Sequence, residues 1–106
     1  MMNAREEARQ ENHKRDCLAR HLISQPFSQQ RDFLKTMKVP ALKQDITRRM
    51  REQLALQIAD MPQNLRQMRF TQLKELAKRS QRNYEWYVDI RNRVNDILKT
   101  RNASHV

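Results

Sequence analysis

The chain of 106 residues has the length of one domain, and its 22 basic and 12 acidic residues give a formal net charge of +10. Glycine is absent, which excludes glycine-rich phosphate loops, nucleophile elbows and dinucleotide-binding turns in their usual form. A single cysteine excludes an intrachain disulfide and fits a reducing compartment. No apolar run is long enough to span a membrane, and residues 1–16 lack the apolar segment of a secretory signal. We therefore expect a single cytoplasmic domain over residues 1–106.

The lack of glycine, the three prolines and the scarcity of β-branched runs predict an all-α fold, a small bundle of four to five helices without a sheet. Any residue with positive φ would have to be asparagine or aspartate, which tolerate that region at some cost. Asn64 and Asn83 lie where such turns are expected.

The first predicted helix occupies residues 1–24, with a charged first half and an apolar second half. Pro26 ends it, because proline lacks an amide donor and restricts the residue before it. The second helix is predicted over about residues 28–37, with Ser28 as its N-cap.

The third predicted helix, residues 40–60, carries an apolar residue every four positions, which places these side chains on one broad face. They are Leu42, Ile46, Met50, Leu54 and Ile58. A break at Pro62 precedes the fourth helix, predicted over about residues 63–80. Its apolar residues are Leu65, Met68, Leu73, Leu76 and Ala77. The boundary at residues 80–83 is weak, so that either a turn or one fused helix fits there.

The fifth predicted helix spans about residues 84–101, and residues 102–106 are expected to fray. It contains Tyr84, Trp86 and Tyr87, half of the chain's six aromatic residues. These rings and their apolar neighbours cover an arc of about 200°, and the remaining face is acidic. Because acidic groups repel phosphate, the pattern favours a core or protein-interface role over base stacking. Four residues also have the spacing of a seam for a possible homodimer: Tyr87, Ile90, Val94 and Ile97.

The excess positive charge lies in the middle of the chain, where ten basic and four acidic residues fall between Lys43 and Arg82. Such a protein is attracted to polyanions, of which nucleic acid is the commonest. The alternative is a solvated surface charge without a dedicated partner. The candidate nucleic-acid-binding residues are Arg48, Arg49, Arg51, Arg66, Gln67, Lys74, Lys78 and Arg82, with Arg69 and Arg79 adding to the same charge.

Residues 49–73 show part of the spacing of a helix-turn-helix. The residues near its small and apolar positions are Leu54, Ala55, Ile58, Leu65 and Met68. Ala59 stands where glycine is usual, however, and Asp60 stands where an apolar residue is common. A plain helical hairpin therefore fits better. In the helix-turn-helix alternative, the residues facing the DNA groove would be Gln63, Arg66, Gln67 and Lys74.

His13, Cys17 and His21 follow one another at intervals of four residues, a spacing at which two side chains of one helix can chelate a metal. The outer two lie about 12 Å apart along the helix axis, too far for one ion. We predict no metal site, and we interpret Cys17 as a small buried residue. No nucleophile-and-base pattern is evident, so we predict no catalytic residue, no enzyme activity and no cofactor.

The segment NAREEARQENHKRDCLARHLISQPFSQQRDFLK has a first helix rich in Arg, Glu and Gln, a Pro-Phe break and a short QQRDFL helix. In these respects it resembles the short uncharacterised helical accessory proteins of proteobacterial phages and prophages. The resemblance is confined to the N-terminal third of the chain. It implies a mobile-element accessory protein that binds nucleic acid or redirects a host protein.

The sequence therefore leaves two functions open. The first is a small basic, non-enzymatic protein whose central helices contact the phosphates of DNA or RNA in a salt-dependent manner. The second is a phage-type adaptor or inhibitor that binds a host protein through an aromatic and arginine-bearing helical face around Tyr84, Trp86 and Tyr87. The net charge favours the first, and the acidic face of the last helix favours the second.

Overall fold

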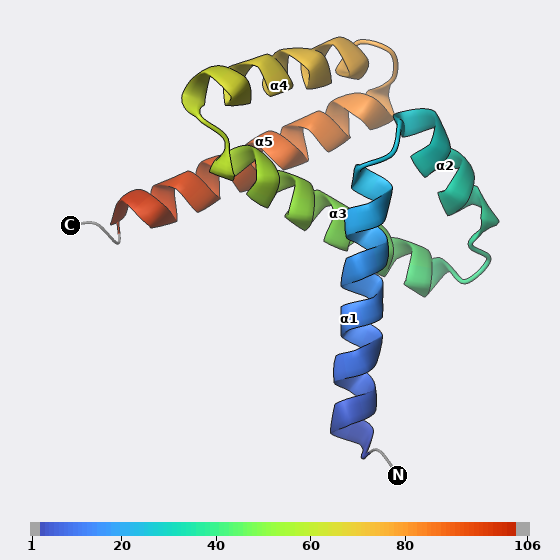
Figure 1. Cartoon of the computed structure of the whole chain (residues 1–106). Helices are drawn as coiled ribbons and strands as arrows, with labels where there is room; N and C mark the ends of the chain where they lie inside the picture. The colour runs from blue at the N-terminus through green and yellow to red at the C-terminus, as the bar shows by residue number, and fades with distance from the viewer. Residues whose placement is uncertain (1–2, 104–106) are drawn as a thin grey trace. The chain divides into compact units, whose positions relative to one another are not determined.

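The computed structural model describes residues 3–103 of the chain. Within this range it contains helices and no strand, which confirms the predicted all-α fold (Figure 1). The helices are α1 (Ala4–Ile23), α2 (Phe27–Thr36), α3 (Pro40–Asp60), α4 (Gln63–Ala77) and α5 (Gln81–Ala103). None of these helices is both long and apolar enough to cross a bilayer.

The chain divides into two compact units, Met1–Gln53 (unit 1) and Leu54–Val106 (unit 2). Helix α3 contributes its residues 40–53 to unit 1 and its residues 54–60 to unit 2. The expectation of one domain over the whole chain stays a prediction.

The first two helices begin and end at local signals. Asn3 caps α1, because its Oδ1 accepts the Glu6 amide at 2.9 Å, and the Ser24 hydroxyl donates to the His21 carbonyl at 2.6 Å at the other end. Helix α2 begins directly after Pro26, which is extended and makes no side-chain cap, so the predicted Ser28 cap is wrong. The Pro26 carbonyl accepts the first helical hydrogen bond, from the Gln30 amide at 3.0 Å.

Helices α4 and α5 are separate, so the fused-helix alternative is wrong. Ser80 starts α5: its Oγ accepts the Asn83 amide at 3.1 Å, and its carbonyl accepts the Tyr84 amide at 3.1 Å. The Asn83 side chain donates to the Leu76 carbonyl at 3.0 Å and so caps the end of α4. No residue in the range 3–103 has positive φ, and Asn64 and Asn83 are both helical, which corrects the turn geometry expected for them.

Helix α5 extends through Ala103, the last residue that the structure describes. Asn102 and Ala103 belong to this helix, and the fraying predicted for residues 102–106 stays a prediction. Residues 104–106 lie outside the described part of the chain.

Each unit has its own apolar core. In unit 1 the buried hydrophobic residues are Ala19, Leu22, Ile23, Ile46 and Met50. In unit 2 they are Leu54, Ala55, Ile58, Ala59, Leu73, Tyr87, Ile90 and Val94. Burial of most of the α3 stripe confirms the apolar face predicted for that helix. Helix α4 lies alongside α5 within unit 2 (Figure 1) and buries Leu73.

Two residues of the predicted apolar face of α4 point elsewhere. Leu65 and Met68 are 47% and 59% exposed, because Leu73 lies about 80° around the helix from Leu65 and further from Met68. The helix-turn-helix spacing required both residues in a core, so the structure lacks that feature of the motif.

Candidate nucleic-acid interface

The structure divides the eight candidate nucleic-acid-binding residues between the two units. Unit 1 contains Arg48, Arg49 and Arg51, and unit 2 contains Arg66, Gln67, Lys74, Lys78 and Arg82. The surroundings of the two groups differ, and this difference decides which side chains are available to a ligand.

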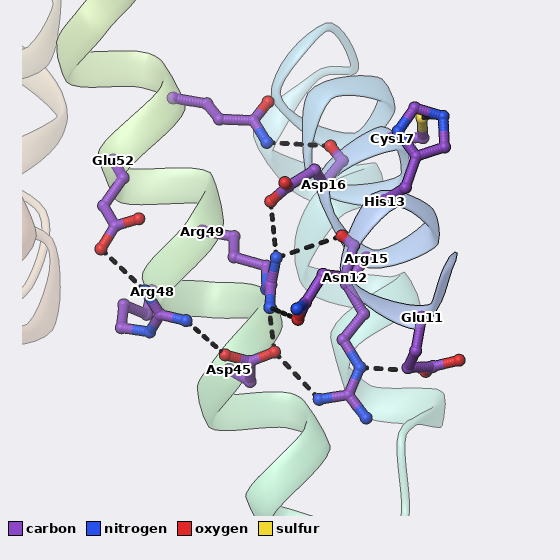
Figure 2. A network of polar contacts seen from close by, with 11 residues as sticks. Glu11, Asn12, His13, Arg15, Asp16, Cys17, Asp45, Arg48, Arg49 and Glu52 are labelled. Carbon is purple, nitrogen blue, oxygen red and sulfur yellow. Dashed lines mark hydrogen bonds and ion pairs between the residues drawn. The ribbon is translucent and has the colours of Figure 1, made fainter. Parts of the chain in front are cut away.

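In unit 1, Asp45 of α3 accepts hydrogen bonds from three arginines (Figure 2). Its Oδ1 accepts from Arg48 Nη2 at 2.6 Å, and its Oδ2 accepts from Arg49 Nε at 2.9 Å and from Arg15 Nη1 at 3.0 Å. The contact with Arg48 is the largest cause holding the Asp45 pKa far below its usual range, followed by those with Arg15 and Arg49. The contact with Asp45 is also the largest cause that raises the pKa of Arg15 and of Arg48, whereas the contact with Asp16 is the largest cause that raises the pKa of Arg49, followed by the contact with Asp45.

This group of charges joins α1 to α3 within unit 1. Arg49 donates to Asp16 Oδ1 at 2.6 Å and to Asn12 Oδ1 at 2.9 Å, and both residues belong to α1. Gln53 donates to the Asp16 carbonyl at 2.9 Å. We call Arg15, Asp16, Asp45, Arg48 and Arg49 the α1–α3 ion-pair network.

Membership of this network limits the use of its arginines as phosphate ligands. The Arg49 side chain is only 12% exposed and already contacts two carboxylates, and Arg48 also pairs with Glu52 at 2.8 Å. A phosphate would have to displace these partners. Arg51 is half-buried. Phosphate contact by these three residues stays a prediction.

In unit 2, Arg66 interacts with the end of α3. Its Nη2 donates to the carbonyl oxygens of Ala59 at 3.3 Å and Met61 at 3.1 Å. The last carbonyls of a helix have no partner within the helix, and the half-buried Arg66 satisfies them together with Arg101, whose Nη1 donates to the Ala59 carbonyl at 3.5 Å.

We expect Arg66→Gln to lower the free energy of unfolding by about 1 kcal/mol, because the shorter side chain loses hydrogen bonds from a charged donor. Urea denaturation followed by tryptophan fluorescence measures this change. Arg69→Gln on the same helix is the control, since Arg69 interacts with the exposed Gln72. Equal effects of the two changes would show that Arg66 has no special role at the α3 end.

The remaining cations of this region are exposed. Lys74 and Lys78 lie one turn apart on α4 and at its C-cap, and Arg79 and Arg82 follow across the turn into α5. The only acidic residue among positions 74–82 is Glu75, which pairs with Lys78 at 2.9 Å. Among residues 3–103, no ion pair engages the other three cations. We call Lys74, Lys78, Arg79 and Arg82 the basic cluster.

The three aromatic residues of α5 have different surroundings. Tyr87 is 5% exposed, as a core role predicts, Trp86 is half-buried and Tyr84 is 51% exposed. The Arg91 guanidinium lies over the Tyr87 ring, 5.6 Å from its centre. Sequence reasoning missed Arg91, although its position four residues after Tyr87 signals a contact on one helix face. Tyr87, Ile90 and Val94 are buried inside unit 2, so a homodimer through this seam would have to expose them.

The cysteine of α1 is exposed, so its predicted burial is wrong. The structure buries Ala19, Leu22 and Ile23, the apolar residues of the last two turns, instead. Cys17 Sγ lies 3.5 Å from His13 Nε2 (Figure 2). Within residues 3–103, no group of three or more His, Cys, Asp or Glu residues is arranged to hold a metal ion.

Comparison of the chain with protein-family models, with curated proteins and with solved structures finds no match.

Proposed function

We propose that this chain is a small, basic, non-enzymatic protein that binds the phosphates of nucleic acid through the basic cluster on α4 and the start of α5. The observation that supports this function is the local charge. Six basic residues and one acidic residue lie between Gln63 and Arg82, and the four cations of the basic cluster are exposed. A cytoplasmic location and the mobile-element origin implied by the N-terminal resemblance belong to the same proposal.

The geometry of α4 is suited to a polyanion that runs along the helix. Gln67, Lys74 and Lys78 are exposed and, at 100° per residue, fall within about 40° of one another around the axis. The ammonium groups of Lys74 and Lys78 can neutralise phosphates. The side-chain amide of Gln67, which lies nearer the start of α4, can donate to a phosphate or a base edge. Binding of this kind releases counterions and weakens as salt rises.

The test is the triple charge reversal Lys74→Glu, Lys78→Glu and Arg82→Glu. We expect a loss of affinity of at least about tenfold for labelled duplex DNA and RNA, and a decrease in the salt slope of about 0.9 for each lost contact with DNA. Fluorescence anisotropy at several salt concentrations measures both quantities.

The matched control reverses three exposed lysines of unit 1, Lys14, Lys35 and Lys38, and so changes the net charge equally. This control keeps the basic cluster and should lose only the long-range part of the attraction. Equal losses in the two variants, or no binding by the wild type at low salt, would rule the proposed interface out.

The second candidate, a phage-type adaptor for a host protein, is favoured by the exposed apolar residues of unit 2. Leu65 and Met68 lie three positions apart on α4, next to one another on its surface. An exposed apolar pair of this kind is found at protein interfaces. Co-purification at moderate salt distinguishes the candidates, since a polynucleotide raises the 260/280 nm absorbance ratio and a polypeptide partner gives a discrete band.

A further inference from the structure

Helix α5 presents an exposed aromatic ring next to the basic cluster. Tyr84 lies in the first turn of α5, two positions after Arg82, and half of its surface is open to solvent. Its hydroxyl and ring have no side-chain hydrogen bond, ion pair or ring contact among the described residues. Packing in the core accounts for the position of the buried Tyr87 ring, but it does not account for the exposed Tyr84 ring.

A second flat group lies on the same side of α5. Arg91 is exposed and follows Tyr84 by seven positions, which places it two turns along the helix, about 10 Å away and within about 20° of the same direction. Its guanidinium lies over the Tyr87 ring, and this contact orients the planar group at the surface. Phenol rings and guanidinium planes are both among the groups on which unstacked bases pack in proteins that bind single strands.

The charge around Tyr84 is favourable to a phosphate backbone. No carboxylate lies between Leu76 and Tyr84. The flanking acids both have partners: Glu75 pairs with Lys78, and Glu85 accepts a hydrogen bond from Gln81 at 3.5 Å. The acidic residues of α5 that argued against base stacking, Glu85, Asp89 and Asp96, lie about 100° or more around the helix from Tyr84.

We propose that the ligand is single-stranded nucleic acid, whose bases stack on Tyr84 and Arg91 while its phosphates contact the basic cluster. This inference rests on the proposed function and specifies its substrate class. A duplex offers phosphates to the basic cluster but keeps its bases stacked inside, so it gains nothing from the two flat groups. The phenol ring and the guanidinium therefore confer a preference for unpaired strands.

Two pairs of substitutions separate stacking from charge. Tyr84→Ala removes the ring, whereas Tyr84→Phe keeps it. Arg91→Ala removes charge and plane together, whereas Arg91→Lys keeps the charge and removes the plane. Tyr84 and Arg91 are both exposed, so these changes leave the core intact, and circular dichroism verifies the helix content of each variant.

The experiment measures anisotropy with a labelled single-stranded oligonucleotide and with the corresponding duplex at one salt concentration. We expect the wild type to prefer the single strand. Loss of one stacked base is worth about 1–3 kcal/mol, so Tyr84→Ala should weaken single-strand binding by about 5-fold to 150-fold and change duplex binding by less than about 2-fold. Tyr84→Phe should bind as the wild type does, and Arg91→Lys should lose single-strand affinity despite its unchanged charge.

A wild type that binds duplex as tightly as single strand would overturn the inference and leave the proposed function standing. So would a Tyr84→Ala variant with unchanged single-strand affinity, an outcome that would assign the exposed ring to another class of partner such as a protein. If the wild type binds neither nucleic acid at low salt, the proposed function fails together with the inference.

Discussion

Replacement of Leu73 with alanine is expected to lower the free energy of unfolding of unit 2 by about 3 kcal/mol. Leu73 is fully buried and is the residue of α4 that the core of this unit encloses. Its truncation removes apolar contacts between α4 and α5 and leaves a cavity that neighbouring side chains fill only in part. Urea denaturation followed by the fluorescence of Trp86 measures the loss, since the only tryptophan of the chain lies on α5 in the same unit.

Leu65→Ala is the matched control for this prediction, because it makes the same chemical change on the same helix at an exposed position. We expect it to alter the free energy of unfolding by no more than about 0.5 kcal/mol. Similar losses for the two variants would mean that Leu73 does not hold α4 against α5.

Replacement of Asp45 with alanine is expected to destabilise the packing of α1 on α3 by about 2 kcal/mol. Three arginines donate to this one carboxylate, and its removal leaves the mostly buried Arg49 with a single carboxylate partner, Asp16. The tryptophan lies in unit 2, so amide hydrogen exchange of α1 is the appropriate measurement. Faster exchange over the second half of α1 is the expected result.

Asp32→Ala is the control, since Asp32 is an exposed carboxylate of unit 1 that joins no ion pair among residues 3–103. Its substitution removes the same charge and should leave the exchange of α1 unchanged. If Asp32→Ala speeds exchange as much as Asp45→Ala does, net charge and not the ion-pair network determines the stability of α1.

The pH dependence of the same measurement follows from the pKa of Asp45. Because the three arginines lower this pKa in the folded state, its stabilising effect is fully present above the pKa of the unfolded carboxyl, about 3.9. The effect is lost progressively as the pH falls below that value toward the folded pKa. Acid should therefore weaken the protection of α1 in the wild type more than in Asp45→Ala, once intrinsic exchange rates are corrected for pH.

The sequence predicted the helices well where proline or a regular stripe marked them. Helix α3 begins at Pro40 and ends at Asp60 as predicted, because Pro40 starts a helical turn, Pro62 stops one, and an apolar residue recurs every four positions between them. Helix α5 was harder to delimit. Its start depends on the hydroxyl of Ser80 and the side chain of Asn83, both of which also fit a turn.

The candidate site could be predicted only in part, because helical periodicity gives the direction of a side chain and not what lies beside it. Tyr84 and Tyr87 fall within one apolar arc, yet only Tyr87 is enclosed. The contacts of Asp45 with Arg48 and Arg49 have the spacing of neighbours on one helix, and that signal was available. The contacts that reach α1, from Arg15 to Asp45 and from Arg49 to Asp16, join residues 30 and 33 positions apart, and no local spacing reveals them.

The connections between the helices have a consequence for how freely this protein can vary. Throughout residues 3–103 no residue has the positive φ that favours glycine. In many proteins a tight turn requires glycine at one position, and glycine has no side chain that could contact a ligand. The α4–α5 connection does not require glycine at any position. It exposes two cations and a glutamine, Lys78, Arg79 and Gln81. Substitutions at these three positions can therefore change the charge of the surface, and so the ligands that it attracts, with little effect on the backbone conformation.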